Sequence, residues 1–469
     1  MAHVTTSPHR GALDPLKHSQ PLGATLVFLG LDRTMPLMHG SQGCASFAKT
    51  LSTRHFREPI PLQTTAVTEV TATLGAGPLV VDGLDVLRTK NNPDIIGVMT
   101  TGLTEVNGED FEGELRNYRA QAEPGGPLVV GVSTPDFKGG LTDGWSAALT
   151  ALMAQIPLDD AESVPEKERP GVAVLIGAGF TVGDVDEITA TILGFGLTSV
   201  VVPGLAYSID GHLDEDWSPL TSGGTTLAQL RTLSAAPLIV AIGASAETPA
   251  ATLADRTGAE VLTLGHVSGL AGTDALIGGL LAHPATDGAP AVVRRDRSRL
   301  ADGLLDAHFV LGGVRVAVAG EPETLLALTT LLSDVGADVV AAISPTNSPA
   351  LRDIACAGVT VGDLTDLEEQ ARDRGAELII GSSHARAVSD RLGTAFVPAG
   401  FPVYDRLGAQ LRRTGGYQGS LALLTDIANA LLDHHHHTGH HHVPPAPSPQ
   451  RAEDPTASQH TPTLEKTSC

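Results

Sequence analysis

Residues 35–53, MPLMHGSQGCASFAKTLST, join a short apolar run to a helix-forming segment through a glycine-containing turn. The run 35–38 predicts a buried strand, and Ser41 is placed to cap a helix predicted over residues 41–53. A strand followed by a turn and a helix is the repeating unit of parallel α/β sheets. This segment therefore favours an α/β fold.

Cys44 would be the third residue of that helix. A thiol in the first turn lies near the positive end of the helix dipole, which favours the thiolate that iron or zinc requires. Gly40 and Gly43 lack Cβ atoms, so a cluster or a second backbone could approach closely. Taken alone, these residues support metal ligation and a structural cysteine about equally. Thiol catalysis with His39 as the base is disfavoured, because no third orienting residue is apparent.

Strand-like runs alternate with helix-length segments along most of the chain, which predicts three Rossmann-like α/β units with mostly parallel sheets flanked by helices. The predicted domains are 21–170, which carries Cys44, then 171–299 and 300–433, after an N-terminal arm over 1–20. Residues 157–171 are charged and broken by prolines, as in a linker. The predicted strands are 35–38, 60–64, 95–100, 128–133, 172–176, 199–202, 238–242, 260–264, 314–319, 338–343, 378–381 and 395–398.

The C-terminal tail, 434–469, is rich in His and then in Pro, Ser and Thr, which predicts disorder. Its histidines at 434–437 and 440–442 could hold a divalent ion through imidazole. Nothing in the sequence fixes a ligand geometry, so an unselective tail is the favoured interpretation.

The overall composition excludes several classes of function. The 53 Asp and Glu residues outnumber the 30 Lys and Arg, and the net charge of −23 disfavours nucleic-acid or anionic-membrane partners. No apolar run reaches the ~18 residues of a membrane span, and no secretory signal opens the sequence. Three cysteines are too few for a disulfide framework, which favours a cytoplasmic protein.

Residues 177–183, GAGFTVG, follow a predicted strand and open a predicted helix. The spacing does not match a dinucleotide fingerprint, because Val182 stands where the third glycine is needed and no acidic residue ends the next strand. A tight strand-to-helix turn is the simpler interpretation. The sequence contains no P-loop, so autonomous ATP hydrolysis is not expected.

Six stretches of the chain carry a longer pattern. They are 16–23 LKHSQPLG, 35–44 MPLMHGSQGC, 54–59 RHFREP, 100–105 TTGLTE, 133–137 STPDF and 400–406 GFPVYDR. Together they resemble the β-type subunits of the nitrogenase family, over about residues 16 to 432. The resemblance implies the three-unit architecture of nitrogenase component 1.

In that family the catalytic β subunit places three cysteines around its P-cluster, at positions that match Ser19, Cys44 and Gly102. Only Cys44 is a cysteine here, so the resemblance implies that the chain cannot build its half of an eight-iron P-cluster. Ser19 is interpreted as the N-cap of a helix that begins at Pro21, and Gly102 as a turn after a strand.

The pattern with one retained cysteine resembles the β-like subunit of the scaffold on which the nitrogenase iron-molybdenum cofactor is assembled. The resemblance implies a scaffold that is not an enzyme, in a two-plus-two heterotetramer with a NifE-like α subunit. A [4Fe-4S] cluster would be shared between the two subunits with Cys44 as one ligand, because such clusters generally use four thiolates. The cofactor precursor would be held mainly by the partner.

Further partners implied by the resemblance are the nitrogenase iron protein, NifB or another precursor carrier, and the apo nitrogenase that receives the cofactor. The alternative is a catalytic β subunit of a nitrogenase-like oxidoreductase. Ser19 and Gly102 are the evidence against it, because they stand where that subunit has cysteines. A third interpretation, a periplasmic-type ligand-binding α/β protein, would require a signal peptide, which the sequence does not predict, and would leave Cys44 unexplained. Cys356 and Cys469 match no cofactor ligand, and a molybdenum and a vanadium system would look nearly alike.

Overall fold

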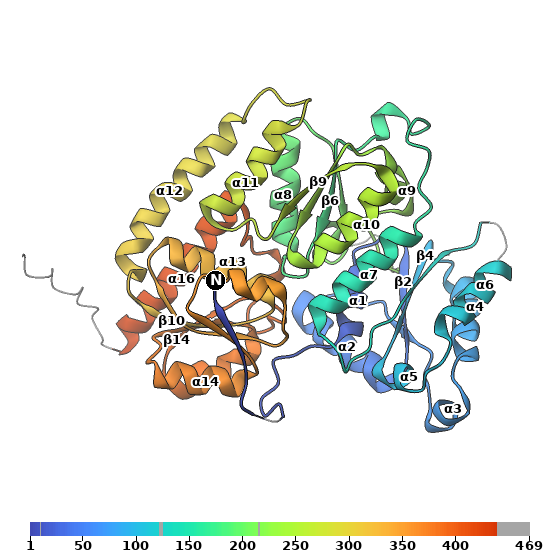
Figure 1. Ribbon diagram of the computed structural model, residues 1–469, viewed down its shortest axis with the longest axis horizontal. Helices are drawn as coiled ribbons and strands as arrows, with labels where there is room; N and C mark the ends of the chain where they lie inside the picture. Colours follow the sequence, from blue (N-terminus) through green and yellow to red (C-terminus); the bar gives the residue numbers. More distant parts are fainter. Residues whose placement is uncertain (10, 122–124, 214–215, 439–469) are drawn as a thin grey trace, which may run out of the picture.

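The computed structural model describes residues 1–9, 11–121, 125–213 and 216–438, and it contains three parallel sheets with helices on their faces (Figure 1). The predicted α/β architecture of three units is confirmed. The three sheets follow one another along the chain, apart from one strand at the N-terminus. The first sheet carries the candidate site.

The first sheet has the strand order β3-β2-β4-β5, and all of its pairs are parallel. Met35 and Leu37 of β2 belong to the core cluster on one face, whereas Met38 belongs to the cluster on the other face, as the two-residue period of a strand requires. Helices α1 and α7 pack together on the Met38 side, and α4 and α6 pack on the Met35 side. The strands are β2 (Thr34–His39), β3 (Gln63–Thr64), β4 (Ile95–Thr100) and β5 (Leu128–Val132).

The strand predicted over 60–64 is wrong in length, since β3 covers only Gln63–Thr64. Pro59 and Pro61 lie on either side of its predicted first residue, Ile60, and proline has no N–H to donate to a sheet. The helices of this unit are α1 (Gln20–Leu29), α2 (Gln42–Phe56), α3 (Glu69–Leu74), α4 (Pro78–Asn91), α5 (Gly102–Val106), α6 (Phe111–Gln121) and α7 (Leu141–Gln155).

The second sheet has the order β7-β6-β8-β9 and occupies the predicted residues. It shares one hydrophobic core with the first unit. Within that core, the Trp145 indole of α7 donates a hydrogen bond to the carbonyl oxygen of Ile176 at 2.9 Å. The elements are β6 (Val172–Ile176), β7 (Ser199–Val202), β8 (Leu238–Ile242), β9 (Glu260–Leu264), α8 (Val182–Gly194), α9 (Leu227–Arg231), α10 (Glu247–Thr257) and α11 (Gly269–Ala282).

The third sheet has the order β1-β12-β11-β10-β13-β14. Two of its strands, β1 and β12, are not predicted from the sequence. β1 lies in the N-terminal arm and pairs in parallel with β12, and Figure 1 shows this N-terminal strand against the third unit. The strands are β1 (His3–Thr6), β10 (Arg315–Ala319), β11 (Asp338–Ser344), β12 (Gly358–Val361), β13 (Leu378–Gly381) and β14 (Ala395–Pro398).

Helix α16 (Gly416–Thr438) runs past the predicted start of the tail, so the disorder predicted from residue 434 is wrong for residues 434–438. Leu424, Ile427 and Leu431 are buried in the core of the third unit and anchor the helix. Once a helix is anchored, each added residue gains a backbone hydrogen bond, which carries it through the first histidines. The rest of the predicted tail, 439–469, lies outside the described residues.

The remaining helices belong to the third unit and to its junction with the second. They are α12 (Ala291–Leu311), α13 (Pro322–Asp334), α14 (Leu364–Asp373) and α15 (Arg386–Leu392). Among the helices of the described residues, none combines the length and apolar character needed to cross a bilayer. The domain boundaries at residues 170 and 299 stay predictions.

Candidate metal-cluster site

The candidate site lies at the carboxyl edge of the first sheet. From β2 the chain passes to β3 on one side and then to β4 on the other, so the winding direction reverses between β2 and β4. In open α/β sheets, ligands bind beyond the carboxyl ends of the strands at such a reversal. The turn with Cys44 follows β2 and Gly102 follows β4 directly. The two positions therefore face the location at which this fold binds ligands.

Cys44 is exposed and is the third residue of α2, as the sequence predicts. Ser41 occupies the N-cap position with extended backbone, but its hydroxyl accepts no hydrogen bond from the helix. The Ser41 Oγ instead lies 3.4 Å from the Cys44 Sγ. A Cβ built on Gly43 would have, among the described residues, only the Ser41 Oγ within 4 Å, at 3.8 Å. The thiol is thus open to a group that approaches from outside the chain.

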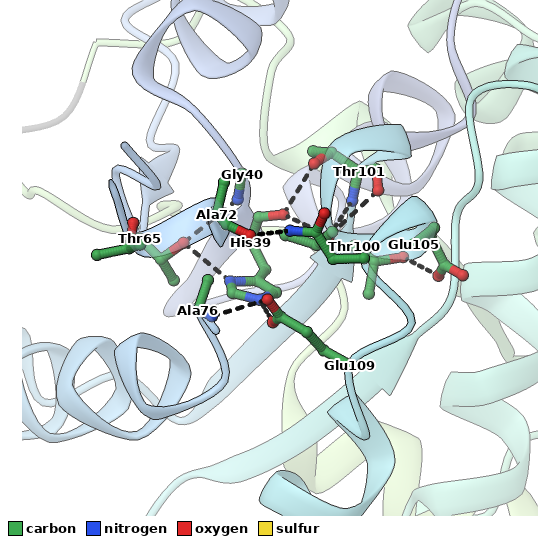
Figure 2. Close-up of polar contacts among 12 residues, drawn as sticks. His39, Gly40, Thr65, Ala72, Ala76, Thr100, Thr101, Glu105 and Glu109 are labelled. Carbon is green, nitrogen blue, oxygen red and sulfur yellow. Dashed lines mark hydrogen bonds and ion pairs between the residues drawn. The ribbon is translucent and has the colours of Figure 1, made fainter. Parts of the chain in front are cut away.

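The turns after β2 and β4 are fastened to each other. A Cβ on Gly40 would lie 2.5 Å from the Thr101 Cγ2, so only glycine fits there. The hydroxyl groups of Thr101 and Thr104 both donate to the carbonyl oxygen of His39, at 3.0 Å and 3.1 Å. Figure 2 shows Thr101 beside His39. Gly40 therefore serves contact between two turns of this chain, and Gly43 leaves the outward side open.

His39 is buried and serves the structure of the first sheet. Its Nε2 lies 3.2 Å from a Glu109 carboxylate oxygen and its Nδ1 lies 2.9 Å from the Thr65 hydroxyl (Figure 2). The other Glu109 oxygen accepts the N–H of Ala76 at 2.7 Å. Burial lowers the pKa of His39, and the hydrogen bond and charge of Glu109 oppose that shift. Because both ring nitrogens have these partners, His39 is not placed as a base for Cys44.

The other two positions that the resemblance singles out, Ser19 and Gly102, have structural roles. The Ser19 hydroxyl accepts the N–H of Leu22 at 3.3 Å, which confirms that it caps α1. Gly102 is the first residue of α5 rather than part of a turn outside a helix. A Cβ on Gly102 would lie 3.2 Å from the Cβ of Asp136, and its N–H donates to the Asp136 Oδ2 at 3.4 Å.

Asp136 is the residue of this site to which the sequence analysis assigns no role. It lies in the turn that follows β5, so it faces the same edge of the sheet. Its Oδ1 is buried and has no hydrogen-bond partner among the described residues. Burial raises the pKa of Asp136, and the Gly102 N–H and the charge of Lys17 oppose that shift. The available signal is a carboxylate in the turn that follows a strand of this sheet, four residues after the strand ends.

Glu105 fastens the ends of β4 and β5. One of its carboxylate oxygens accepts the hydroxyl groups of Thr100 and Ser133, each at 2.5 Å. Figure 2 shows the Thr100 contact. The Thr134 N–H also donates to the Thr100 hydroxyl, at 2.8 Å. The turns after β2, β4 and β5, which are neighbouring strands in the sheet, are thus joined to one another by hydrogen bonds.

The donor set fits one ligand to an iron-sulfur cluster and does not fit a complete site. Among the described residues, no three His, Cys, Asp or Glu side chains are grouped so as to hold a metal ion. An exposed thiol in a first helical turn is a suitable soft ligand, but a [4Fe-4S] cluster generally needs four. Cys356 is half-buried and its Sγ donates to the Gly358 carbonyl at 3.2 Å, which fits a structural role. Cys469 lies outside the described residues.

The glycine-containing turn at 177–183 is occupied by a carboxylate of the chain itself. Glu323, at the start of α13, accepts the N–H of Gly179 at 3.1 Å and that of Ser245 at 2.5 Å. A Cβ on Gly177 would lie 2.6 Å from a Glu323 carboxylate oxygen. These contacts explain Gly177 and Gly179 without a nucleotide, because Glu323 takes the backbone donors that a phosphate would use. A Cβ on Gly183 would instead lie 2.4 Å from the carbonyl oxygen of Leu411.

Comparison with known proteins agrees with this geometry. The family model described as nitrogenase component 1 type oxidoreductase matches residues 19–432. Nitrogenase iron-molybdenum cofactor biosynthesis protein NifN of Rippkaea orientalis is 42% identical over 435 residues, which cover 90% of this chain and 94% of that protein. NifN of Rhodobacter capsulatus is 39% identical over 433 residues, covering 92% of this chain and 94% of that protein.

A solved structure of nitrogenase Cp1 at pH 6.5 matches the fold with a TM-score of 0.84 and 26% identity, covering 91% of this chain and 95% of that one. The resemblance inferred from the six sequence stretches is thereby confirmed. The family match spans most of the chain, and the relatives share well over a third of their residues with it along nine-tenths of its length. The chain therefore belongs to the nitrogenase component 1 type oxidoreductase family.

Proposed function

We propose that this chain is the β-like subunit of a scaffold on which the nitrogenase iron-molybdenum cofactor is assembled before transfer to apo nitrogenase. We further propose that Cys44 supplies one ligand to a [4Fe-4S] cluster at the interface with an α-like partner. The observation that carries the proposal is a single exposed thiol at the winding reversal of the first sheet. Relatives named as cofactor biosynthesis proteins support it.

Exposed apolar side chains occur on α2, on α5 and in the turn after β5, and they support a partner surface at this end of the first unit. Phe47 is 68% exposed and lies three residues after Cys44, on the same side of α2. Val106 of α5 is 74% exposed, and Phe137, beside Asp136, is 59% exposed. Neighbouring exposed apolar side chains mark surfaces that another protein covers. We assign this surface to a NifE-like α subunit, with two copies of each chain in the complex.

The scaffold fits the site better than the catalytic β subunit does. Ser19 uses its hydroxyl to cap α1, and Gly102 has no side chain to offer. Cys44 is then the one thiol that the described part of the chain brings to this edge. When bound, the cluster would supply electron-transfer chemistry, and this chain would hold one of its irons and exclude water from one side.

The remaining partners follow from this role. A scaffold must receive a precursor, so we propose NifB or another carrier as the donor. Completion of the cofactor would involve the nitrogenase iron protein, and apo nitrogenase would be the acceptor. The precursor itself would lie mainly on the α-like subunit, because Cys44 is already committed to the interfacial cluster.

The Cys44 thiol is tested by substitution in the complex purified with its α-like partner. Cys44→Ala should lose most of the cluster iron and the electron paramagnetic resonance signal of the reduced cluster, since three thiolates leave one iron open. Cys44→Ser should be milder, because a hydroxyl ligates weakly. Cys356→Ala is the matched control and should keep the iron content and the spectrum of the wild type. Full iron and an unchanged spectrum in Cys44→Ala would falsify the ligand assignment.

A further inference from the structure

Helix α12 buries one face and exposes another. Its buried residues, spaced seven or four apart, pack inward, and the helix lies against α16 and α11: Val293, Leu300, Ala307 and Leu311. A second set is exposed and alternates spacings of three and four: Val292, Arg295, Arg299, Asp302, Asp306 and Phe309. Residues at such spacings lie in one stripe along a helix, which we call the outer stripe. Figure 1 shows α12 at the outer edge of the molecule, well away from α5.

The charged residues of α12 differ in whether the chain itself supplies a partner. Outside the outer stripe, each has one. Arg297 pairs with Asp274 at 2.7 Å. The Asp296 carboxylate accepts the Gln418 side-chain amide at 2.7 Å, and Arg294 donates to a backbone carbonyl. The four charged side chains of the outer stripe have no ion pair or hydrogen bond with the described part of the chain. Their partners must come from solvent or from another molecule.

The charges of the outer stripe are separated by sign along the helix. Arg295 and Arg299 lie one turn apart in its first half, and Asp302 and Asp306 lie one turn apart in its second half. Like charges four residues apart on a helix repel each other. The arrangement is therefore unfavourable within a single helix. A second helix that presents the opposite order of charges would compensate it.

The outer stripe itself has that opposite order when it runs in the reverse direction. In an antiparallel pair of α12 helices with a two-fold axis between residues 300 and 301, Arg299 of one copy faces Asp302 of the other. The same register places Arg295 opposite Asp306. Because the axis relates the two copies, each of these contacts occurs twice. All four charges of the stripe are then paired with opposite charges.

The same register also joins the two apolar ends of the stripe. Val292 lies opposite Phe309 of the second copy, and these side chains are 56% and 82% exposed in the single chain. A parallel pair in register would instead place each charge opposite a like charge, which is unfavourable at an interface. The complementarity therefore identifies one occupant for this face, a second copy of this chain in the antiparallel direction.

We propose that the outer stripe of α12 is the surface through which two copies of this chain associate about a two-fold axis. The inference rests on the proposed function, since it supplies the contact between the two halves of the two-plus-two complex. In Figure 1, α12 is well separated from α2 and α5, which carry the surface assigned to the α-like subunit. One chain can therefore contact the α-like subunit and a second copy of itself at the same time.

The test reverses one charge in the complex purified with its α-like partner and measures mass against concentration by sedimentation. Arg299→Asp should weaken the association of the two halves by roughly ten-fold or more, because it places aspartates opposite each other twice. Arg299→Asp with Asp302→Arg should restore the association, because the exchanged pair is again complementary. Arg294→Asp is the matched control, since it makes the same change of charge on the same helix outside the stripe. It should associate as the wild type does.

Three results would overturn the inference. They are wild-type association in Arg299→Asp, no recovery in the double variant, and loss of the α-like subunit from Arg299→Asp, which would assign the stripe to that subunit. The iron content separates this inference from the proposed function. The charge variants should keep the wild-type iron per pair of unlike chains, because the stripe lies away from Cys44. Full iron in Cys44→Ala would remove the proposed ligand, whereas the masses would still report the contact through α12.

Discussion

At the scale of single residues, two serines that precede helices have different uses. Ser19 caps α1 through a hydrogen bond from the Leu22 N–H, whereas the Ser41 hydroxyl faces the Cys44 thiol. Both have extended backbone at the N-cap, so the capping pattern in the sequence is the same. The difference depends on where the hydroxyl points, which the sequence does not specify.

Ser19→Ala should lower the free energy of unfolding by about 1 kcal/mol, because a helix N–H loses its acceptor in a buried helix. Ser41→Ala is the matched control and should change it by much less, because no helix N–H bonds to that hydroxyl. The measurement is urea unfolding of both variants beside the wild type. Equal losses in the two variants would contradict the capping assignment of Ser19.

The sequence predicts the place of Cys44 in its helix but not the role of Asp136. The first follows from a local pattern: a capping residue follows an apolar run, and the cysteine comes three positions after the capping residue. The second depends on a contact between the turns after β4 and β5, which are separated by 34 residues. Such a contact exists only once the sheet has formed its register.

At the scale of elements, the Glu323 carboxylate joins α13 of the third unit to two βα turns of the second. It accepts N–H groups from the turns after β6 and β8. Burial raises the pKa of Glu323, and these hydrogen bonds oppose the shift. Its neighbour Glu321 is also buried, and its carboxylate accepts a hydrogen bond from the Thr142 hydroxyl, at 2.8 Å.

Glu323→Gln should destabilise the protein by about 1–3 kcal/mol, because the amide NH2 of glutamine would face a backbone donor and leave it unsatisfied. Glu321→Gln is the matched control at neutral pH. Burial raises the pKa of Glu321 to about 7, and a glutamine oxygen can still accept the Thr142 hydroxyl. Denaturant unfolding at pH 7 compares the two. A larger loss for Glu321→Gln would contradict this account of the two turns.

The predicted strands β6, β7 and β8 of the second sheet are right because each is a short, mostly buried apolar run with turn residues at its ends. β1 is missed because its four residues are mostly polar and exposed, and its partner lies in the third unit. The helical histidines of α16 are missed for a different reason. Their composition favours disorder, and burial of the preceding leucines overrides it.

At the scale of the whole molecule, histidines line the contact between the first and third units. His18 and His55 both present their rings edge-on to Phe401, at centroid distances of 5.6 Å and 4.9 Å, and His18 stacks on His384 at 5.7 Å. Burial lowers the pKa of His18 and of His55 to about 4. The His55 Nδ1 accepts the Val403 N–H at 2.9 Å, as a neutral ring can.

His55→Gln should flatten the dependence of stability on pH between 6.5 and 4. The folded-state pKa of about 4 lies below the usual value of 6.5, so the stabilisation by neutral His55 is full above pH 6.5 and is lost as the pH falls. That loss is on the order of 3 kcal/mol. Glutamine keeps an acceptor for Val403 without titrating. The measurement is the urea midpoint at several pH values.

Glu321→Gln is the control, because the titration of Glu321 changes stability with pH in the direction opposite to that of His55. The pKa of Glu321 is raised to about 7, so its contribution to stability is full below its usual pKa of 4.5 and is lost as the pH rises through 7. Removing it should make the acid-side fall in stability steeper than in the wild type. The assignment of the neutral histidines would be contradicted if His55→Gln left the pH profile unchanged.

The pairing of β1 with β12 has a consequence for the newly made chain. His3 lies beside Gly358 in the sheet, so its partner is synthesised 355 residues later. At ~5–20 residues per second, β1 leaves the ribosome roughly 20–70 seconds before a strand exists for it to join. The first and second units have time to form in that interval, but the third sheet cannot close at this edge until the oldest segment of the chain returns to it. A large fusion placed directly before His3 would therefore hinder the pairing of β1 with β12, which is the last step of folding, rather than the first step.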